Sequence, residues 1–253
     1  MAEPPRRAAH IGRQGPSMLS RVLGVIGELL ITAALLLAGF AFWQLYWTSY
    51  QVEGPRAQVV ASFATEHAPE SDGTGEVRTD DPPEFAKELA PGEVYGLVHV
   101  PSWDWMRMPL AETTTVPVLD SGWIGHYEST AQAGGIGNFS IAAHRRSYGN
   151  SFRWIDRLQP GDPVVVELDD RYLVYTVDSS EIVEADDPTN IRVIAPVIGD
   201  VTWTQAPTER WMTMTTCHPE YGDWQRYAVH LKFVSWTPKS TGVPPELVGE
   251  PAE

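Results

Sequence analysis

Two runs of alternating residues near the carboxyl end constrain the fold of this chain more than any other feature. In residues 211–217, and again in residues 227–233, every second side chain shares a face, which is the pattern of a β-strand. The residues between the runs, 218–225, include a proline and a glycine, which end strand pairing and turn the chain. The pattern predicts an antiparallel hairpin that returns Arg226 close to Cys217.

Cys217 is the only cysteine of the chain. A thiol with the ordinary pKa of about 8.5 is mostly protonated at neutral pH, so a nucleophilic cysteine needs a nearby base and a positive neighbour. Arg226 keeps its charge at any relevant pH and is suited to stabilise an oxyanion. The alternative is that Cys217 is a small buried hydrophobe and Arg226 a solvated charge, because free cysteine is among the most buried residue types.

The residues around this pair resemble a known family. The string T-M-T-T-C at 213–217, followed after eight residues by Arg226, is similar to the T-L-x-T-C … R signature of sortases, the cysteine transpeptidases of Gram-positive cell envelopes. The longer string T-T-C-H-P-x-Y at 215–221, with Q-R at 225–226 and V-H at 229–230, resembles the class E sortases of actinobacteria. The resemblance implies that Cys217 and Arg226 are catalytic residues.

Seven histidines compete for the role of the base, and position along the chain leaves His126 and His144. His144 is the second residue of a stretch, 143–152, that is similar to the family's G-H-R-x-x-Y-G-x-P-F segment around the catalytic histidine. This chain departs from that segment with Ala143 for glycine and Ser151 for proline. The resemblance implies that His144 is the third catalytic residue.

A second segment resembles the part of the family that lines the peptide groove. Residues 125–131, G-H-Y-E-S-T-A, are similar to the family's G-H-Y-P-G-T-A. The resemblance implies that His126 and Tyr127 contact the substrate peptide, and that Thr216 assists at the oxyanion. Glu128 and Ser129 depart from the family segment and bear on peptide specificity.

The amino-terminal part has the composition of a membrane anchor. Residues 22–42 are apolar with few exceptions, and as a helix at ~1.5 Å per residue they span ~31 Å, about one hydrocarbon core. We predict a cytoplasmic basic tail over 1–21 and a transmembrane anchor over 22–43. Arginines before the apolar run and aromatic residues after it predict a cytoplasmic amino terminus and an extracytoplasmic domain. A cleaved signal peptide, the alternative, usually has a shorter apolar run.

The remainder divides by composition. Residues 44–93 are rich in small and polar residues and predict a flexible extracytoplasmic spacer, and residues 237–253 predict a disordered tail. Between them, 94–236 should form a mainly β domain. Many short strands with helical turns at 151–158 predict a closed, mostly antiparallel barrel. The expected strands, besides the hairpin, are 94–100, 115–119, 138–144, 163–168 and 171–177. The resemblance implies the eight-stranded sortase barrel with short helical insertions.

Charge and ligand chemistry exclude some functions. The formal net charge of -15 argues against nucleic acid as a partner, because phosphates would be repelled. Zinc needs three or four convergent ligands, and Cys217 with its neighbour His218 gives poor support for such a site. The acidic residues Glu184, Asp186 and Asp187 could bind calcium, as in some members of the family, but they are interpreted as solvated. We therefore expect no metal and no cofactor.

The resemblance implies a membrane-anchored sortase that cleaves a C-terminal sorting signal between Thr and Gly through a Cys217 thioester. The acyl group then passes to a cell-wall amine. The implied partners are surface proteins with a Leu-Ala-x-Thr-Gly or Leu-Pro-x-Thr-Gly type signal, and a peptidoglycan precursor or pilin amine as acceptor. Alternatives are a pilin-polymerising sortase, an L,D-transpeptidase-like cysteine acyltransferase and an inactive, tethered binding module.

Overall fold

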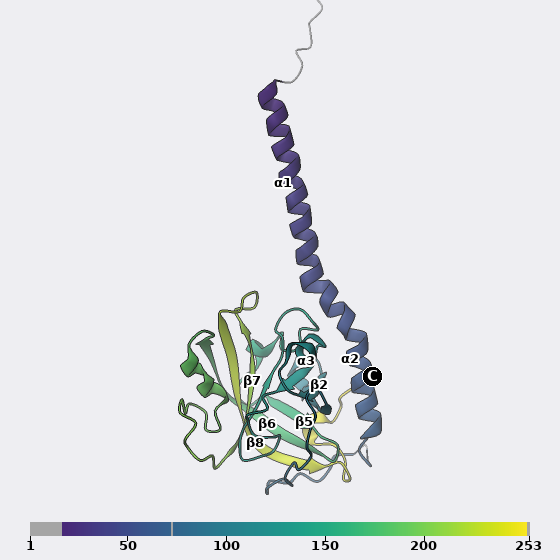
Figure 1. Cartoon of the computed structure of the whole chain (residues 1–253). Coiled ribbons are helices and arrows are strands. Elements are labelled where there is room, and N and C mark those ends of the chain that lie inside the picture. The colour runs from purple at the N-terminus through teal and green to yellow at the C-terminus, as the bar shows by residue number, and fades with distance from the viewer. Residues whose placement is uncertain (1–16, 72, 252–253) are drawn as a thin grey trace, which may run out of the picture. The chain divides into compact units, whose positions relative to one another are not determined.

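The computed structural model describes residues 17–71 and 73–251, in two compact units, Met1–Gln44 and Leu45–Glu253 (Figure 1). The described part of the first unit contains α1 (Met18–Phe42), which begins where the side chain of Ser17 accepts a hydrogen bond from the Ser20 N–H. Among the described residues, one helix is long and apolar enough to span a bilayer by length and composition, and it includes α1. The predicted apolar helix is confirmed, while most of the basic tail predicted at 1–21 lies outside the described residues.

Eight strands of the second unit close into a barrel in the order β1-β2-β3-β4-β7-β8-β6-β5. Neighbouring strands are antiparallel except β2 with β3 and β4 with β7, which run parallel. The predicted eight-stranded barrel is confirmed. The strands are β1 (Val94–Val100), β2 (Met106–Glu112), β3 (Ile124–His126), β4 (Gly137–Ala142), β5 (Pro163–Glu167), β6 (Arg171–Glu184), β7 (Arg210–His218) and β8 (Gln225–Pro238).

Short helical segments connect the strands, and one replaces a predicted strand. The prediction of a strand at 115–119 is wrong, because these residues form α3 (Val116–Asp120). Pro117 lies in the first turn of this helix, where backbone N–H groups have no acceptor within the helix, so the missing N–H of proline costs no hydrogen bond. The sequence pattern also fails to reveal β2 and β3, because β3 is only three residues long and β2 contains Pro109. The other helical segments are η1 (Trp43–Trp47), α2 (Thr48–Glu66), η2 (Pro101–Trp103), η3 (Ile155–Arg157), η4 (Pro188–Ile194) and η5 (Pro245–Leu247).

The hydrophobic core fills the interior of the barrel. On β7, Met212 and Met214 are fully buried in this core, as are Val229 and Leu231 on β8. Burying each such side chain contributes about 1.5–3 kcal/mol relative to leaving it exposed. Because strand side chains alternate, the face of β7 that ends in Cys217 lies outside the barrel. The hairpin therefore presents its polar and reactive side chains on the outer surface.

Helix α2 lies against the barrel within the stretch whose composition predicts a flexible spacer (Figure 1). Val60 and Phe63 are buried against Leu97 and Val94 of β1. The helix contains Gly54 and Pro55 and lacks a clear apolar period, so its sequence alone gives little sign of order. Tertiary contacts of a few apolar side chains stabilise it instead.

The segment after α2 and the carboxyl-terminal segment also pack on the barrel, although their compositions predict disorder. The backbone of Arg78 exchanges two hydrogen bonds with that of Trp236, at 2.8 and 2.9 Å. Thr74 forms a parallel bridge with Val243. Phe85 packs against the main core. The first segment therefore pairs with both β8 and the carboxyl-terminal segment, an order that composition cannot indicate.

A buried charged cluster fastens the carboxyl-terminal segment to β1 and β5. His99 Nε2 lies 2.7 Å from Glu167 Oε2, and His99 Nδ1 lies 3.1 Å from Glu250 Oε1. Lys239 Nζ donates to Glu167 Oε1 at 2.6 Å. Burial alone lowers the pKa of His99, but the hydrogen bonds to Glu167 and Glu250 outweigh it and hold that pKa above its ordinary value. Burial likewise raises the pKa of Glu167, yet His99 and Lys239 outweigh it and hold that pKa below its ordinary value.

This cluster predicts a pH-dependent stability. The pKa of His99 is higher in the folded than in the unfolded chain, so its stabilisation is full below the unfolded value of 6.5 and is lost as the pH rises through the folded value. We expect His99→Gln to lower the free energy of unfolding by roughly 3 kcal/mol near pH 5.5, because the buried Glu167 and the partly buried Glu250 each lose a charged partner. Near pH 9 the difference from the wild type should be smaller.

Denaturant unfolding of both proteins at the two pH values measures this difference. Glu167 acts in the opposite direction, but only as the pH falls through its lowered pKa, below this window. A difference that is constant with pH, or larger at the alkaline end, would contradict the assignment.

Candidate active site

The reactive candidates lie where three neighbouring strands end. Cys217, the free and half-buried cysteine, is the second-to-last residue of β7. Its partner across the antiparallel β7–β8 pair is Arg226, the second residue of β8. The structure therefore brings together the two ends of the predicted hairpin.

On its other side, β7 pairs in parallel with β4, where Ala142 is the partner of Thr215. Beyond that point, the Ala143 N–H donates to the Thr215 carbonyl at 3.4 Å and the Thr216 hydroxyl donates to the Ala143 carbonyl at 2.7 Å. Two residues past Ala142 is His144, and two residues past Thr215 is Cys217. The segment that carries His144 therefore follows β4 on one side of β7, and Arg226 lies on the other side, in β8.

Tyr127, directly after β3, connects these groups. Its hydroxyl lies 3.0 Å from Thr215 Oγ1. Burial raises the pKa of the Tyr127 phenol, the hydrogen bond with Thr215 and the charge of Arg226 lower it, and Cys217 raises it. The phenol is therefore within electrostatic reach of both Cys217 and Arg226, on the outer face of β7.

His144 has a carboxylate partner that the sequence does not reveal. Its Nε2 lies 2.8 Å from Oδ1 of Asp120, and both side chains are less than one-third exposed. When Nε2 carries the proton that Asp120 accepts, Nδ1 of the neutral ring is free to accept a proton. The carboxylate also stabilises the imidazolium, so this pair is suited to general acid–base chemistry.

Arg226 has donors directed at backbone oxygens of its own loop. Its Nη1 donates to the Asp223 carbonyl at 2.6 Å and to the Gln225 carbonyl at 2.9 Å. Among the described residues, no carboxylate lies within salt-bridge distance of its guanidinium. Its charge is therefore held in place without being neutralised, as oxyanion stabilisation requires.

Comparison with known proteins identifies the family of this chain. The model of a family described as the sortase domain matches residues 98–234, which is more than half of the chain. The chain belongs to the sortase family. Sortases are cysteine transpeptidases, so the predicted family and enzyme class are confirmed at that level.

The related sequences include two class E sortases of Streptomyces coelicolor. This sortase is 32% identical to Sortase SrtE1 over 249 residues, which cover 96% of the chain and 65% of that relative. It is 30% identical to Sortase SrtE2 over 86% of the chain and 85% of that relative. The chain thus spans slightly less than two thirds of SrtE1 and most of SrtE2.

Solved structures give the same family. The SrtA sortase from Actinomyces oris matches 70% of this chain and 99% of its own, with 40% identity and a TM-score of 0.64. Sortase E1 from Streptomyces coelicolor, solved with a tripeptide in the active site, matches 64% of this chain and all of its own, with 37% identity and a TM-score of 0.57. The predicted likeness to class E is confirmed.

Two of the residues predicted to bind substrate, His126 and Thr216, are buried and hydrogen-bonded to other protein groups. His126 is fully buried, and its ring nitrogens lie 2.9 Å from Glu112 Oε2 and 3.0 Å from the Ala131 carbonyl. The buried Thr216 hydroxyl is occupied by the Ala143 carbonyl. Of the three residues suggested for the groove, Tyr127 is the one whose polar atom lies beside the reactive groups.

The other folded-domain histidines have structural partners. His218 Nδ1 lies 2.8 Å from Arg145 Nη1, and burial together with the Arg145 charge lowers the pKa of this imidazole. His230 joins Thr213 and Glu181, and His99 belongs to the buried cluster described above. Among the described residues, no three His, Cys, Asp or Glu side chains converge as metal ligands.

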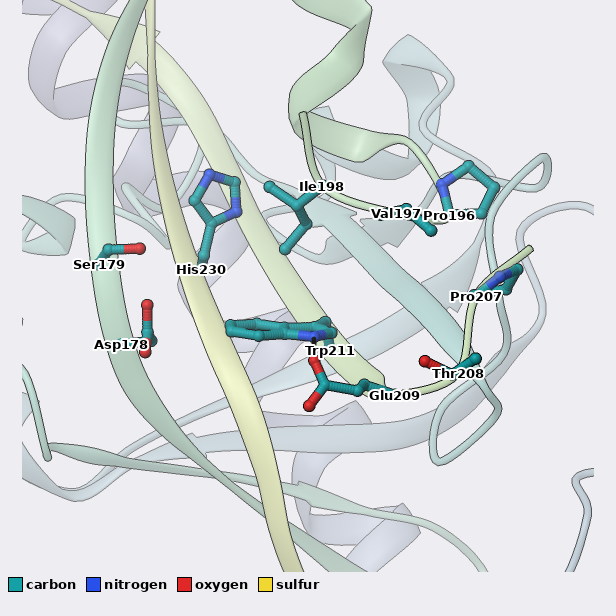
Figure 2. A pocket seen from close by; sticks show the side chains of 10 residues that line it. All are labelled: Asp178, Ser179, Pro196, Val197, Ile198, Pro207, Thr208, Glu209, Trp211 and His230. Atoms are coloured by element: carbon teal, nitrogen blue, oxygen red, sulfur yellow. Dashed lines mark hydrogen bonds between the residues drawn. The ribbon is translucent and has the colours of Figure 1, made fainter. Parts of the chain in front are cut away.

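A hollow of about 340 Å³ opens at the opposite end of β7 (Figure 2). Figure 2 shows the Trp211 ring between His230 and Glu209, with Asp178 and Ser179 on the adjoining strand. Trp211 is six residues before Cys217, roughly 20 Å along a strand. The hollow is therefore separate from the site of the cysteine.

The Asp120–His144 contact generates a prediction. We expect Asp120→Asn to reduce kcat for peptide cleavage by on the order of 100-fold with little change in KM, because the imidazole loses its orienting carboxylate. Asp104→Asn is a matched control, since Asp104 is exposed in the turn between β1 and β2. Steady-state kinetics of the full chain in detergent micelles measures both variants. Equal kcat values for Asp120→Asn and the control would contradict a positioning role.

Proposed function

We propose that this sortase cleaves a C-terminal sorting signal between Thr and Gly and transfers the new carboxyl end to a cell-wall amine. The observation that carries this proposal is the strand register, which pairs Cys217 with Arg226 and joins β7 to β4, the strand that leads to His144. A nucleophile, an acid–base group and a fixed cation at one sheet edge are the parts that acyl transfer requires.

The proposed reaction has two halves. The Cys217 thiolate attacks the threonine carbonyl, and Arg226 stabilises the oxyanion of the tetrahedral intermediate. The C–N bond to glycine breaks as His144 gives a proton to the departing amine, which leaves a thioester on Cys217. An acceptor amine then loses a proton to His144 and attacks the thioester, forming a new amide and releasing the Cys217 thiolate.

The substrates that we propose for this sortase are based on its similarity to class E sortases. Sorting signals of the type Leu-Ala-x-Thr-Gly or Leu-Pro-x-Thr-Gly would supply the acyl group, and a peptidoglycan precursor or a pilin lysine the amine. The tripeptide in the active site of the Streptomyces coelicolor relative supports a peptide substrate. A pilin-polymerising sortase remains the second candidate, because the two differ in the acceptor rather than in the cysteine chemistry.

The proposed location is the cell membrane, with a single pass and an extracytoplasmic catalytic unit. The support is α1, whose 25 residues extend about 37 Å as a helix and present apolar side chains. The arginines before α1 and the aromatic residues after it favour a cytoplasmic amino terminus.

The nucleophile is tested by Cys217→Ala. We expect this variant to lose cleavage of Leu-Ala-x-Thr-Gly pentapeptides while its melting temperature changes little, because a half-exposed side chain loses one small group. Mass spectrometry of full-length protein with a peptide panel and candidate amines measures the thioester and the product. A scrambled pentapeptide is the substrate control. Substantial turnover by the alanine variant would end the assignment of Cys217, and an unreactive wild-type thiol would favour the inactive module.

The role of Arg226 is tested by Arg226→Lys, which keeps the charge and loses the planar fork. We expect kcat/KM to fall on the order of 100-fold, because a single lost oxyanion donor has an effect of that size. Arg78→Lys, on an exposed arginine paired with Glu76, is the matched control. Normal kinetics for Arg226→Lys would show that its geometry has no part in the reaction.

A further inference from the structure

The loop that follows His144 is attached to the first turns of α2. The Tyr148 N–H donates to Thr48 Oγ1 at 3.4 Å, and Arg56 Nη1 donates to the Gly149 carbonyl at 3.1 Å. Gly149 has a φ of 91°, and a Cβ there would meet Arg56 Nη1 at 3.0 Å. Glycine thus permits a close approach that fixes the loop to the helix.

This attachment limits how far the loop can be from the membrane anchor. α1 ends at Phe42 and Thr48 is six residues later. A chain spans at most about 3.5 Å per residue, so the Thr48 backbone lies within about 21 Å of the end of α1 in any arrangement of the two units, and the loop is hydrogen-bonded to Thr48. An anchor in the bilayer therefore keeps this face of the catalytic unit near the lipid surface.

Exposed tyrosines gather on that face around a hollow of about 270 Å³. Tyr46 is 64% exposed, Tyr50 70% and Tyr221, from the loop between β7 and β8, 69%. These large rings are little covered by protein. Tyrosine is favoured at the headgroup level of a membrane, where the ring and its hydroxyl are both accommodated.

Cations accompany the tyrosines, in a chain whose net charge is -15. The guanidinium groups of Arg153 and Arg157 lie 5.5 and 5.0 Å from the centre of the Trp154 ring. Both arginines are exposed, and neither has a carboxylate partner among the described residues. Arg146 lies 4.8 Å above the Tyr221 ring and pairs with Glu220. The surface therefore combines arginines with aromatic rings, and its carboxylates include Glu53 in the wall of the hollow and Glu220 beside Arg146.

Buried polar atoms in the wall of the hollow lack partners. Within the part of the chain that the structure describes, Ser49 Oγ, Asn150 Oδ1 and Arg146 Nε form no hydrogen bond. Leaving such groups unsatisfied costs about 1–3 kcal/mol each, so native proteins seldom do so without a reason. A ligand with both phosphate oxygens and hydroxyl groups offers partners of both kinds.

We propose that this surface, the headgroup face (Tyr50, Arg146, Arg153, Arg157 and Tyr221), binds anionic phospholipid headgroups of the membrane that holds α1. Anionic lipid attracts each nearby arginine by about 1 kcal/mol, and the tyrosine rings enter the interface. The catalytic unit then docks on the bilayer with the His144 loop next to the lipid. The inference rests on the proposed membrane anchoring and is independent of the proposed acyl transfer.

Spin labelling of the full chain in vesicles tests the docking. In a Cys217→Ser background, a single cysteine is introduced as Asp223→Cys, beside Tyr221, or as Ser71→Cys. Ser71 lies beyond the far end of α2, a helix about 28 Å long. In vesicles that contain phosphatidylglycerol, we expect the label at 223 to be several-fold less accessible to a water-soluble nickel chelate than the label at 71. In phosphatidylcholine alone, the difference should largely disappear.

A charge-reversal pair identifies the cations responsible. The double variant Arg153→Glu, Arg157→Glu should raise the nickel accessibility of the label at 223 to that of the label at 71. The double variant Lys87→Glu, Lys232→Glu makes the same charge change elsewhere and should not. Peptide cleavage in detergent micelles by the arginine variants, made with Cys217 intact, should equal that of the wild type, which separates docking from chemistry. Equal nickel accessibility at 223 and 71 in anionic vesicles, or equal loss with both charge reversals, would overturn the proposal.

Discussion

The backbone hydrogen bonds that hold β7 between β4 and β8 determine whether this protein has an active site at all. Strand side chains alternate with a period of two, so a slip of one residue exchanges the faces of a strand. Such a slip would turn Cys217 toward the barrel interior and bring Met214 to the surface. The same pairing joins Cys217 to Arg226 of β8, and joins β7 to β4, the strand that leads to His144. The chemistry is thus a property of register more than of any single side chain.

A polar network outside the barrel stabilises this register. Thr213 Oγ1 donates to Asn138 Oδ1 at 2.8 Å and lies 2.9 Å from His230 Nδ1, whose Nε2 is 3.1 Å from Glu181 Oε1. These contacts cross β4, β7, β8 and β6 in one row. Since buried polar groups lose free energy when unpaired, any shift of β7 would break several bonds at once. Burial lowers the pKa of His230, while the hydrogen bond and the charge of Glu181 act in the opposite direction.

The sequence predicts what is local and leaves out what depends on distant partners. The hairpin that joins Cys217 and Arg226 follows from alternation and a short loop. The parallel pairing of β4 with β7 joins segments about 70 residues apart and has no local signal, so only the family resemblance selects His144. Asp120 stays hidden because its segment, with Pro117, looks like an edge strand. Helix α2 is hidden by Gly54 and Pro55, since tertiary contacts determine its order.

The proposed acyl transfer requires the Cys217 sulfur atom to lie between the His144 imidazole and the Arg226 guanidinium. A crystal structure of the chain with a peptidyl ketone bound covalently to Cys217 measures both separations directly. We expect the His144 ring and the Arg226 guanidinium each to lie within about 6 Å of the sulfur, on opposite sides of it. Only at such a range does a neighbouring charge strongly affect the ionisation of a thiol. Either group farther away, or both on the same side with the peptide elsewhere, would contradict it.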